Sequence, residues 1–457
     1  MNGKTRAFIK MTLAGGVLLA GGGMAAAQSL EEALAITYQS NPTLAGARVN
    51  LRSVDEGVPQ AKAGWRPRVT LSGAAGYIDA TTKSGNNAEV SGDSFPLTGR
   101  LTVNQTLLDS GRTDALVRRA ENNVELERAR LFLIESQVLL SGIRAYLEVI
   151  RQQSTLALRV KNVARLSKQL EASRDRFQVG EVTKTDVAQA ESRLASAKSA
   201  RAVAQSDLSG ARLEFERFIG QAPADLTQPT APADLPQSRD EAVQRGLESN
   251  FNLARARLNE VQAELTLDAI TAEFFPRLAL VAQGQVQRNT GGGDNRSETL
   301  SVEAQVTVPL YQAGGLSART RAAKERINQA RIGIEEMRRE ITDRVASAYE
   351  SWTASLTQIE SLQAAVKAAE IALDGVNQEA TVGARTVLDT LDAEQELLGA
   401  QVSLVSAERN SLLIAFQLLN EMGELTAARL KLPVELYDYD SHFRAVRDLY
   451  WGTDMPE

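Results

Sequence analysis

The sequence predicts a mainly α-helical protein with a membrane β-barrel portion, built from two tandem structural repeats. Three observations carry this prediction. The sequence of one unit recurs 209 residues later, as in Trp65-Arg66-Pro67-Arg68 and Phe274-Phe275-Pro276-Arg277. Two long tracts, 97–222 and 310–432, contain no proline, which leaves room for long helices. Four short segments between the helical parts alternate apolar and polar residues with the period of a β-strand.

Residues 1–27 read as a secretory signal peptide. Lys4, Arg6 and Lys10 precede or begin an apolar stretch, and Ala25-Ala26-Ala27 supplies the small residues of a cleavage site. The apolar stretch is too short for a transmembrane anchor. The chain has no cysteine, so we expect an exported protein that is not a lipoprotein and has no disulfide or thiolate metal site.

The repeats are expected over 28–220 and 238–423, each made of two helical hairpins, with long or split helices, and two strands. The early residues match at an offset of 209, but Val179-Gly180 matches Val382-Gly383 at an offset of 203. Since loops absorb length changes more readily than helices, we place the missing six residues in the turn-rich segment between Pro276 and Gly314.

Each repeat is expected to hold one very long helix followed by a shorter one. The long helices are predicted over 111–180 and 314–383, and the shorter ones over 184–219 and 387–422, because these segments are rich in Ala, Leu, Glu, Arg and Gln. At about 1.5 Å per residue a long helix would extend on the order of 100 Å. Such a length indicates a coiled-coil-like assembly.

Four strands are predicted over 68–79, 97–108, 277–287 and 300–310. Each alternates one apolar face with one mostly polar face, the pattern of a transmembrane β-barrel. Gly- and Asn-rich loops around 84–87 and 291–295 join each pair. A soluble β-sandwich would show the same alternation, but it would not explain strands placed between such long helices.

Four strands cannot close a barrel, and unpaired edges in lipid would leave backbone groups without hydrogen-bond partners. The chain is therefore expected to complete its membrane domain as an oligomer. Two copies would give eight strands with a filled interior, whereas three would give twelve strands and an open lumen. The polar faces favour the channel.

Two segments lie outside the repeats. Residues 221–237 contain four prolines and read as an extended linker, and residues 424–457 form a C-terminal tail unlike either copy. The net charge of −6 argues against a nucleic-acid partner. His442 is the only histidine, so the parts of a histidine-based catalytic or metal site are lacking. We expect no enzyme activity, no cofactor and no metal site.

The chain resembles the TolC family of trimeric outer-membrane exit ducts. The resemblance covers both copies and is most specific at 176–180 with Thr185-Asp186-Val187, and at 382–393. It implies a homotrimer with a twelve-stranded β-barrel in outer-membrane lipid, continued by a twelve-helix α-barrel across the periplasm. It also implies docking onto a periplasmic adaptor (membrane fusion) protein and an inner-membrane ABC or other pump. The tail is similar to those of the branch serving type I protein secretion, which favours that role over small-molecule or drug efflux.

The resemblance also assigns roles to residues at the tips of the helices. Asp389 and Asp392 match the periplasmic constriction, where a trimer would place six carboxylates around one axis and attract cations. Thr185, Asp186 and Arg385 match the latch that holds the gate shut.

Val179, Gly180, Val382 and Gly383 match the turns that meet the adaptor. A structural role is the alternative for several of these residues. Asp186 and Asp389 fit N-terminal capping boxes, and the glycines fit helix C-termini. The rival reading of the whole chain is a periplasmic coiled-coil scaffold or adaptor without its own membrane channel.

Overall fold

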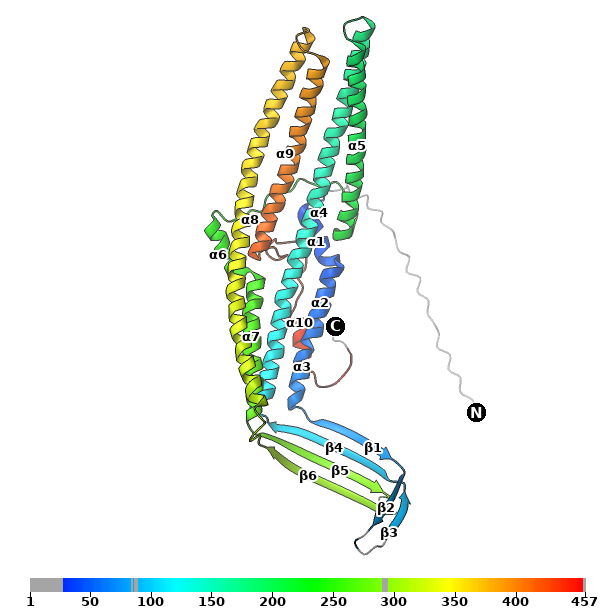
Figure 1. The fold of residues 1–457 in the computed structure, drawn as a ribbon, viewed down its shortest axis with the longest axis vertical. Helices are drawn as coiled ribbons and strands as arrows, with labels where there is room; N and C mark the ends of the chain where they lie inside the picture. The colour runs from blue at the N-terminus through cyan, green and yellow to red at the C-terminus, as the bar shows by residue number, and fades with distance from the viewer. Residues whose placement is uncertain (1–27, 84, 86–88, 290–294, 455–457) are drawn as a thin grey trace, which may run out of the picture.

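The computed structural model describes residues 28–83, 85, 89–289 and 295–454. The predicted signal peptide, most of the first predicted hairpin loop and residues 290–294 of the second lie outside the described residues. The molecule is elongated, with long helical hairpins at one end and a sheet at the other (Figure 1).

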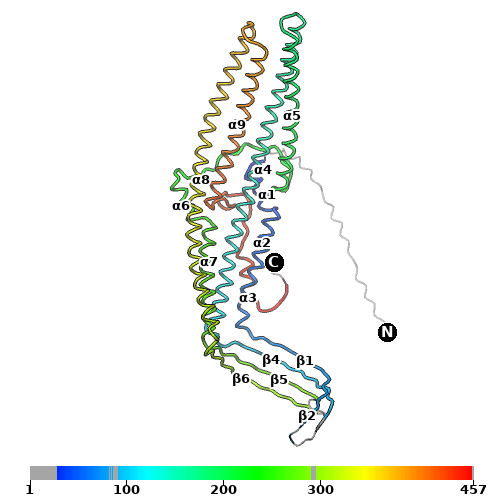
Figure 2. The backbone as a smooth tube through the Cα atoms, viewed as in Figure 1, coloured from blue at the N-terminus to red at the C-terminus, as the bar shows by residue number. Residues whose placement is uncertain are grey.

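The two longest helices occupy equivalent places in the two copies. α4 (Arg112–Gln178) and α8 (Gly315–Thr381) have 67 residues each. Each is followed by a helix of 36 residues, α5 (Lys184–Ile219) or α9 (Val387–Met422). The path of the backbone shows the hairpins α4/α5 and α8/α9 extending side by side to two separate tips (Figure 2).

Shorter helices complete each copy and run alongside the lower half of the long ones. In both copies an asparagine, Asn41 or Asn250, ends one short helix and caps the next with its side chain. The shorter helices of the first copy are α1 (Leu30–Ser40), α2 (Pro42–Asp55), α3 (Gly57–Lys62) and η1 (Ala63–Trp65). Those of the second copy are α6 (Arg239–Ser249), α7 (Phe251–Thr271) and η2 (Ala272–Phe274). No helix of the described residues is both long and apolar enough to cross a membrane.

The strands of both copies join in one antiparallel sheet of order β1-β4-β5-β6. The bounds are β1 (Arg68–Ala75), β4 (Leu97–Leu108), β5 (Arg277–Arg288) and β6 (Arg296–Thr307). The repeats meet at the β4/β5 pair, which leaves β1 and β6 as the two edges of the sheet within the chain.

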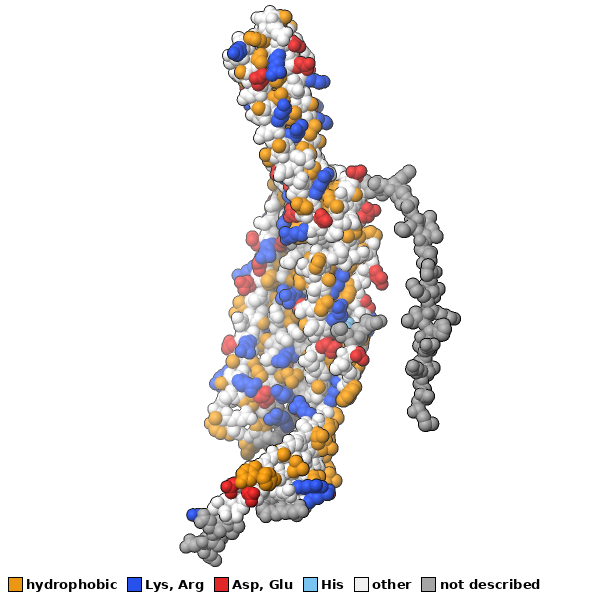
Figure 3. Space-filling view, turned by 90° about the vertical axis from the view of Figure 1, so that its right-hand side faces the viewer, with side chains coloured by type: hydrophobic (Ala, Val, Ile, Leu, Met, Phe, Trp, Pro, Cys, Tyr) orange, Lys and Arg blue, Asp and Glu red, His pale blue; other side chains and the backbone are white. Residues whose placement is uncertain are grey.

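The pairing register gathers apolar side chains on one face. Leu101 pairs with Leu71 on one side and Gly284 on the other, and Gly284 pairs with Leu300. The next row joins Val69, Val103, Ala282 and Val302 in the same way. Leu300 is 83% exposed, and Figure 3 shows hydrophobic side chains over the lower end of the molecule. The opposite face carries polar groups, among them Arg100, whose Nε donates to Gln285 at 3.0 Å.

Two predicted strand boundaries are wrong. The strand expected over 68–79 ends at Ala75, where the Gly76 N–H donates to the carbonyl of Pro96. Beyond that point β2 (Ile78–Lys83) pairs with β3 (Glu89–Ser94) as a separate two-stranded sheet. The strand expected over 300–310 is shifted toward the N-terminus and ends at Thr307, two residues before Pro309, which has no N–H to donate.

A large apolar core lies in the middle of the molecule, where the short helices meet the long ones. Tyr146 of α4 is fully buried there, and its hydroxyl lies 2.8 Å from the carbonyl oxygens of both Gln28 and Thr227. One side chain thus contacts the start of the first copy and the linker between the copies.

The C-terminal tail packs along α2, α3 and α4. It contains α10 (Ser441–Val446), in which His442 Nδ1 lies 3.0 Å from the buried carboxylate of Asp55. Burial raises the pKa of Asp55, although His442 and Arg128 act in the opposite direction. Arg128 of α4 forms an ion pair with Asp440 and lies over the ring of Tyr439.

Candidate gate at the helical tips

Both hairpins turn at their tips with the same backbone geometry. Gly180 and Gly383 have φ of 82° and 79°, the left-handed conformation that ends many helices. In the first turn the N–H of Glu181 donates to Arg176, and in the second Ala384 donates to Glu379. The two glycines therefore serve as helix terminators, whatever else the turns contact.

A capping box follows each turn. The carboxylate of Asp186 accepts from the backbone N–H and the hydroxyl of Thr183, both at 2.8 Å. Asp389 makes the equivalent bonds to Thr386 at 2.9 and 2.8 Å. Both aspartates therefore take part in the N-terminal capping boxes that the sequence predicts. Donation from the Thr386 backbone and then its hydroxyl lowers the pKa of Asp389, with a smaller contribution from Arg385. Asp389 thus favours the ionised form.

Asp392 makes a different contact. Its Oδ1 lies 2.6 Å from Nη2 of Arg193 on α5, so this ion pair joins the two hairpins near their tips. Both side chains are about half exposed to solvent. The sequence did not single out Arg193, because the contact depends on how α5 and α9 align in space.

The structure does not bring the predicted latch together within one chain. Arg385 Nε lies 2.8 Å from Glu379 of its own hairpin, rather than contacting Thr185 or Asp186. Those two residues are on the other tip, and the tips stand apart in Figure 1. Within one chain Arg385 is therefore held by the turn next to it.

A buried carboxylate lies behind the exposed aspartates. Glu394 of α9 is 8% exposed and lines a cavity of about 320 Å³ between α4, α5 and α9. Its Oε2 has no hydrogen-bond partner, and burial raises its pKa despite the nearby Arg165. Sequence reasoning missed Glu394, which has the spacing of an ordinary helix-surface residue.

The tips expose apolar side chains to solvent. Val179 and Val382 are 72% and 80% exposed, next to Gly180 and Gly383. Across the described ranges no three His, Asp or Glu side chains are grouped so that they could hold a metal ion. The tips therefore offer paired turns, capped aspartates and one ion pair between hairpins.

Comparison with known sequences identifies the family. The family model described as "Outer membrane efflux protein" matches residues 33–221 and 242–424, so both repeats fall within it. The outer membrane efflux protein BepC of Brucella suis is 32% identical over 98% of both chains. The outer membrane protein TolC of Vibrio cholerae is 23% identical over 88% of this chain and 92% of its own. The alkaline protease secretion protein AprF of Pseudomonas aeruginosa is 29% identical over 66% of this chain and 64% of its own.

Solved structures show the same fold. The outer membrane protein VceC of Vibrio cholerae aligns with a TM-score of 0.73 at 20% identity, over 86% of this chain and 96% of its own. The CmeC outer membrane channel of Campylobacter jejuni aligns with a TM-score of 0.74 at 14% identity, over 92% and 89%. With both repeats matched and the fold shared, the chain belongs to the outer membrane efflux protein family and has the TolC-like channel fold.

Proposed function

We propose that three copies of this chain form a channel through the outer membrane that continues across the periplasm as the exit duct of a tripartite export system. Its partners are a periplasmic adaptor protein and an inner-membrane ABC or other pump. Residues 1–27 direct export and are removed, and the apolar barrel face contacts outer-membrane lipid.

The four-stranded sheet is the observation that carries this proposal. One face is apolar and exposed across all four strands, while the other carries Arg100, Gln283 and Gln285. The edges β1 and β6 would be left unpaired in lipid, at a cost of several kcal/mol for each orphaned backbone group. Three copies joined edge to edge give twelve strands, enough for a polar lumen.

Type I protein secretion is favoured over small-molecule or drug efflux. AprF is named for the secretion of a protein, and the C-terminal tail of this chain is similar to those of the branch serving type I secretion. BepC is named for efflux, so identifying the transported substrate is what distinguishes protein secretion from efflux. Comparing export of a protein substrate and of a dye by cells with and without the chain distinguishes them.

The proposed gate lies at the helical tips. Asp389 and Asp392 form the constriction, and Thr185, Asp186 and Arg385 act as the latch between tips in the trimer. The exposed turns at Val179-Gly180 and Val382-Gly383 receive the adaptor. The Arg193–Asp392 ion pair supports this assignment, because dilating the tips would separate α5 from α9 and break it.

Substituting Arg385→Ser or Asp186→Ala should raise the single-channel conductance of the purified duct. Arg385→Ser removes the ion pair to Glu379 that holds the second turn, and Asp186→Ala removes the carboxylate half of the capping box of α5, which accepts from the backbone N–H and the hydroxyl of Thr183. Recordings in planar bilayers measure the effect. Arg174→Ser is the matched control, since it breaks an exposed ion pair between α4 and α5 at 2.5 Å without touching either turn. Unchanged conductance in both tip variants would remove these residues from the gate.

The same recordings test the proposed function itself. The mature protein should insert and give small, cation-selective currents that a trivalent cation blocks from the periplasmic side. A periplasmic scaffold or adaptor would give no insertion and no current.

A further inference from the structure

A cavity rich in arginine lies where the helices meet the sheet. Its volume is about 410 Å³, and it spans α7 between the first turns of α4 and α8. Four arginines and one carboxylate, Glu273, line it together with five uncharged residues. The arginines are Arg112, Arg119, Arg319 and Arg326.

The single carboxylate does not neutralise these arginines. Glu273 pairs with Arg319 at 2.8 Å, and this contact, followed by the influence of Arg112, lowers the pKa of Glu273. Arg112 Nε is enclosed and lies 3.6 Å from Glu273, so the second ion pair of this carboxylate is longer than the first. Among the described residues, Arg119 and Arg326 form no ion pair within 4.0 Å. The cavity therefore keeps an excess of positive charge.

The N-terminus of α8 adds to this charge, whereas at the start of α4 the buried carboxylate of Asp109 already accepts from the N–H of Thr113 at 2.7 Å. α4 begins at Arg112 and α8 at Gly315, so the N-termini of both helices lie at the same junction. The unpaired N–H groups of a helix N-terminus carry partial positive charge. The backbone and the arginines thus favour the same kind of ligand.

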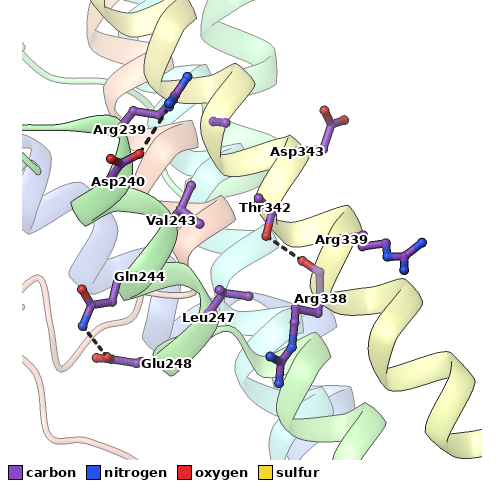
Figure 4. A pocket seen from close by; sticks show the side chains of 11 residues that line it. Arg239, Asp240, Val243, Gln244, Leu247, Glu248, Arg338, Arg339, Thr342 and Asp343 are labelled. Carbon is purple, nitrogen blue, oxygen red and sulfur yellow. Dashed lines mark hydrogen bonds and ion pairs between the residues drawn. The ribbon is translucent and has the colours of Figure 1, made fainter.

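A larger groove elsewhere shows that such an imbalance is not general. The groove between α6 and α8, of about 760 Å³, is lined by three arginines and three acidic residues. Arg239 pairs with Asp240, and Gln244 donates to Glu248, as Figure 4 shows. Its charges balance, so it does not select for the sign of a ligand.

The arginine cavity opens on the face of the helical wall away from the tail. Arg128 of α4 contacts the tail through Asp440 and Tyr439. Arg119 precedes Arg128 by nine residues, or two and a half helical turns, and therefore points in the opposite direction. In the proposed trimer a tail on the outer surface leaves the lumen open, and the cavity, on the opposite face of the wall, would then face the lumen.

We propose that this cavity binds the carboxylate groups of acidic polypeptide segments as they pass through the duct. The inference rests on the proposed function, since a lumenal site requires the trimer, in which three such cavities encircle the path. A guanidinium group matches a carboxylate with two parallel hydrogen bonds. An acidic segment that has passed the aspartates of the tip meets complementary charge at the entrance to the barrel.

Isothermal titration calorimetry with a hexaglutamate peptide tests the site on the full mature protein in a zwitterionic detergent. The double variant Arg119→Gln/Arg326→Gln should weaken binding at least about tenfold, which corresponds to the loss of one charged hydrogen bond. Arg118→Gln/Arg321→Gln is the matched control. It removes the same charge from the same two helices at residues that do not line the cavity, and its affinity should stay within about twofold of the parent.

The outcomes separate this inference from the function on which it rests. Hexaglutamate should also reduce single-channel current, and less so in Arg119→Gln/Arg326→Gln. If the channels are normal but hexaglutamate does not bind, or if both double variants weaken its binding equally, the proposed binding site is wrong. The proposed channel function is unaffected by either result. If hexaglutamate binding depends on Arg119 and Arg326 but the protein gives no current, the binding site is supported and the channel function is contradicted.

Discussion

Substituting Asp389→Asn and Asp392→Asn together should raise the trivalent-cation concentration that half-blocks the channel by about 100-fold, because six carboxylates would be lost from the axis of the proposed trimer. Asparagine keeps an acceptor oxygen for the capping bonds from Thr386. The change therefore removes charge without removing the cap. Titrating the block in single-channel recordings, with the cation on the periplasmic side, gives the shift.

The block should also depend on pH through the charge of Asp389. Within one chain, hydrogen bonds from the backbone and the hydroxyl of Thr386 lower the pKa of Asp389 from the ordinary value of about 3.9, while repulsion between the carboxylates of the ring acts in the opposite direction. Glu370→Gln/Asp374→Gln is the control, since both residues are exposed on α8 before the same turn. An equal loss of block in the control would mean that general surface charge, and not a ring at the constriction, attracts the cation.

Gly423→Ala should destabilise the protein by more than about 3 kcal/mol, from left-handed strain and overpacking together. Gly423 ends α9 with φ of 80°, and a Cβ there would lie 2.6 Å from the carbonyl oxygen of Ser249 and 2.7 Å from Cα of Asn250. These are backbone atoms at the end of α6 and the start of α7, which cannot turn aside as a side chain can. We expect a lower temperature for the loss of helical circular dichroism and a lower yield of folded protein.

Gly383→Ala separates the two contributions to that cost. Gly383 has nearly the same φ, 79°, but no atom lies within 4 Å of the added Cβ. Its cost should be limited to the backbone strain, about 1 to 2 kcal/mol. Equal destabilisation by the two substitutions would show that the close approach to Ser249 contributes nothing.

The helical part of the fold follows closely from local sequence signals. Glycines at 111, 180, 314 and 383 flank the long helices, and α4 and α8 end within two residues of them. The sheet is less predictable. The pairing of β2 with β3 depends on where Gly76 meets Pro96, which alternation alone does not reveal.

The candidate gate was only partly predictable for the same reason. The capping boxes are local, so Thr183 with Asp186 and Thr386 with Asp389 can be recognised in the sequence. The Arg193–Asp392 pair and the buried Glu394 depend on the alignment of helices from different copies. The arginine cavity likewise draws on three helices far apart in the chain.

The docking of the C-terminal tail affects the order in which contacts form during folding. His442 contacts Asp55 across 387 positions of sequence, and Lys62 and Arg66 of the first copy contact Asp448 and Leu449 near the other end. Contacts between such distant positions form late, because the intervening chain must first be brought together. The packing of the first copy is therefore complete only after the C-terminal tail has been synthesised and has docked. A chain truncated in the tail would leave one side of α2 and α4 exposed.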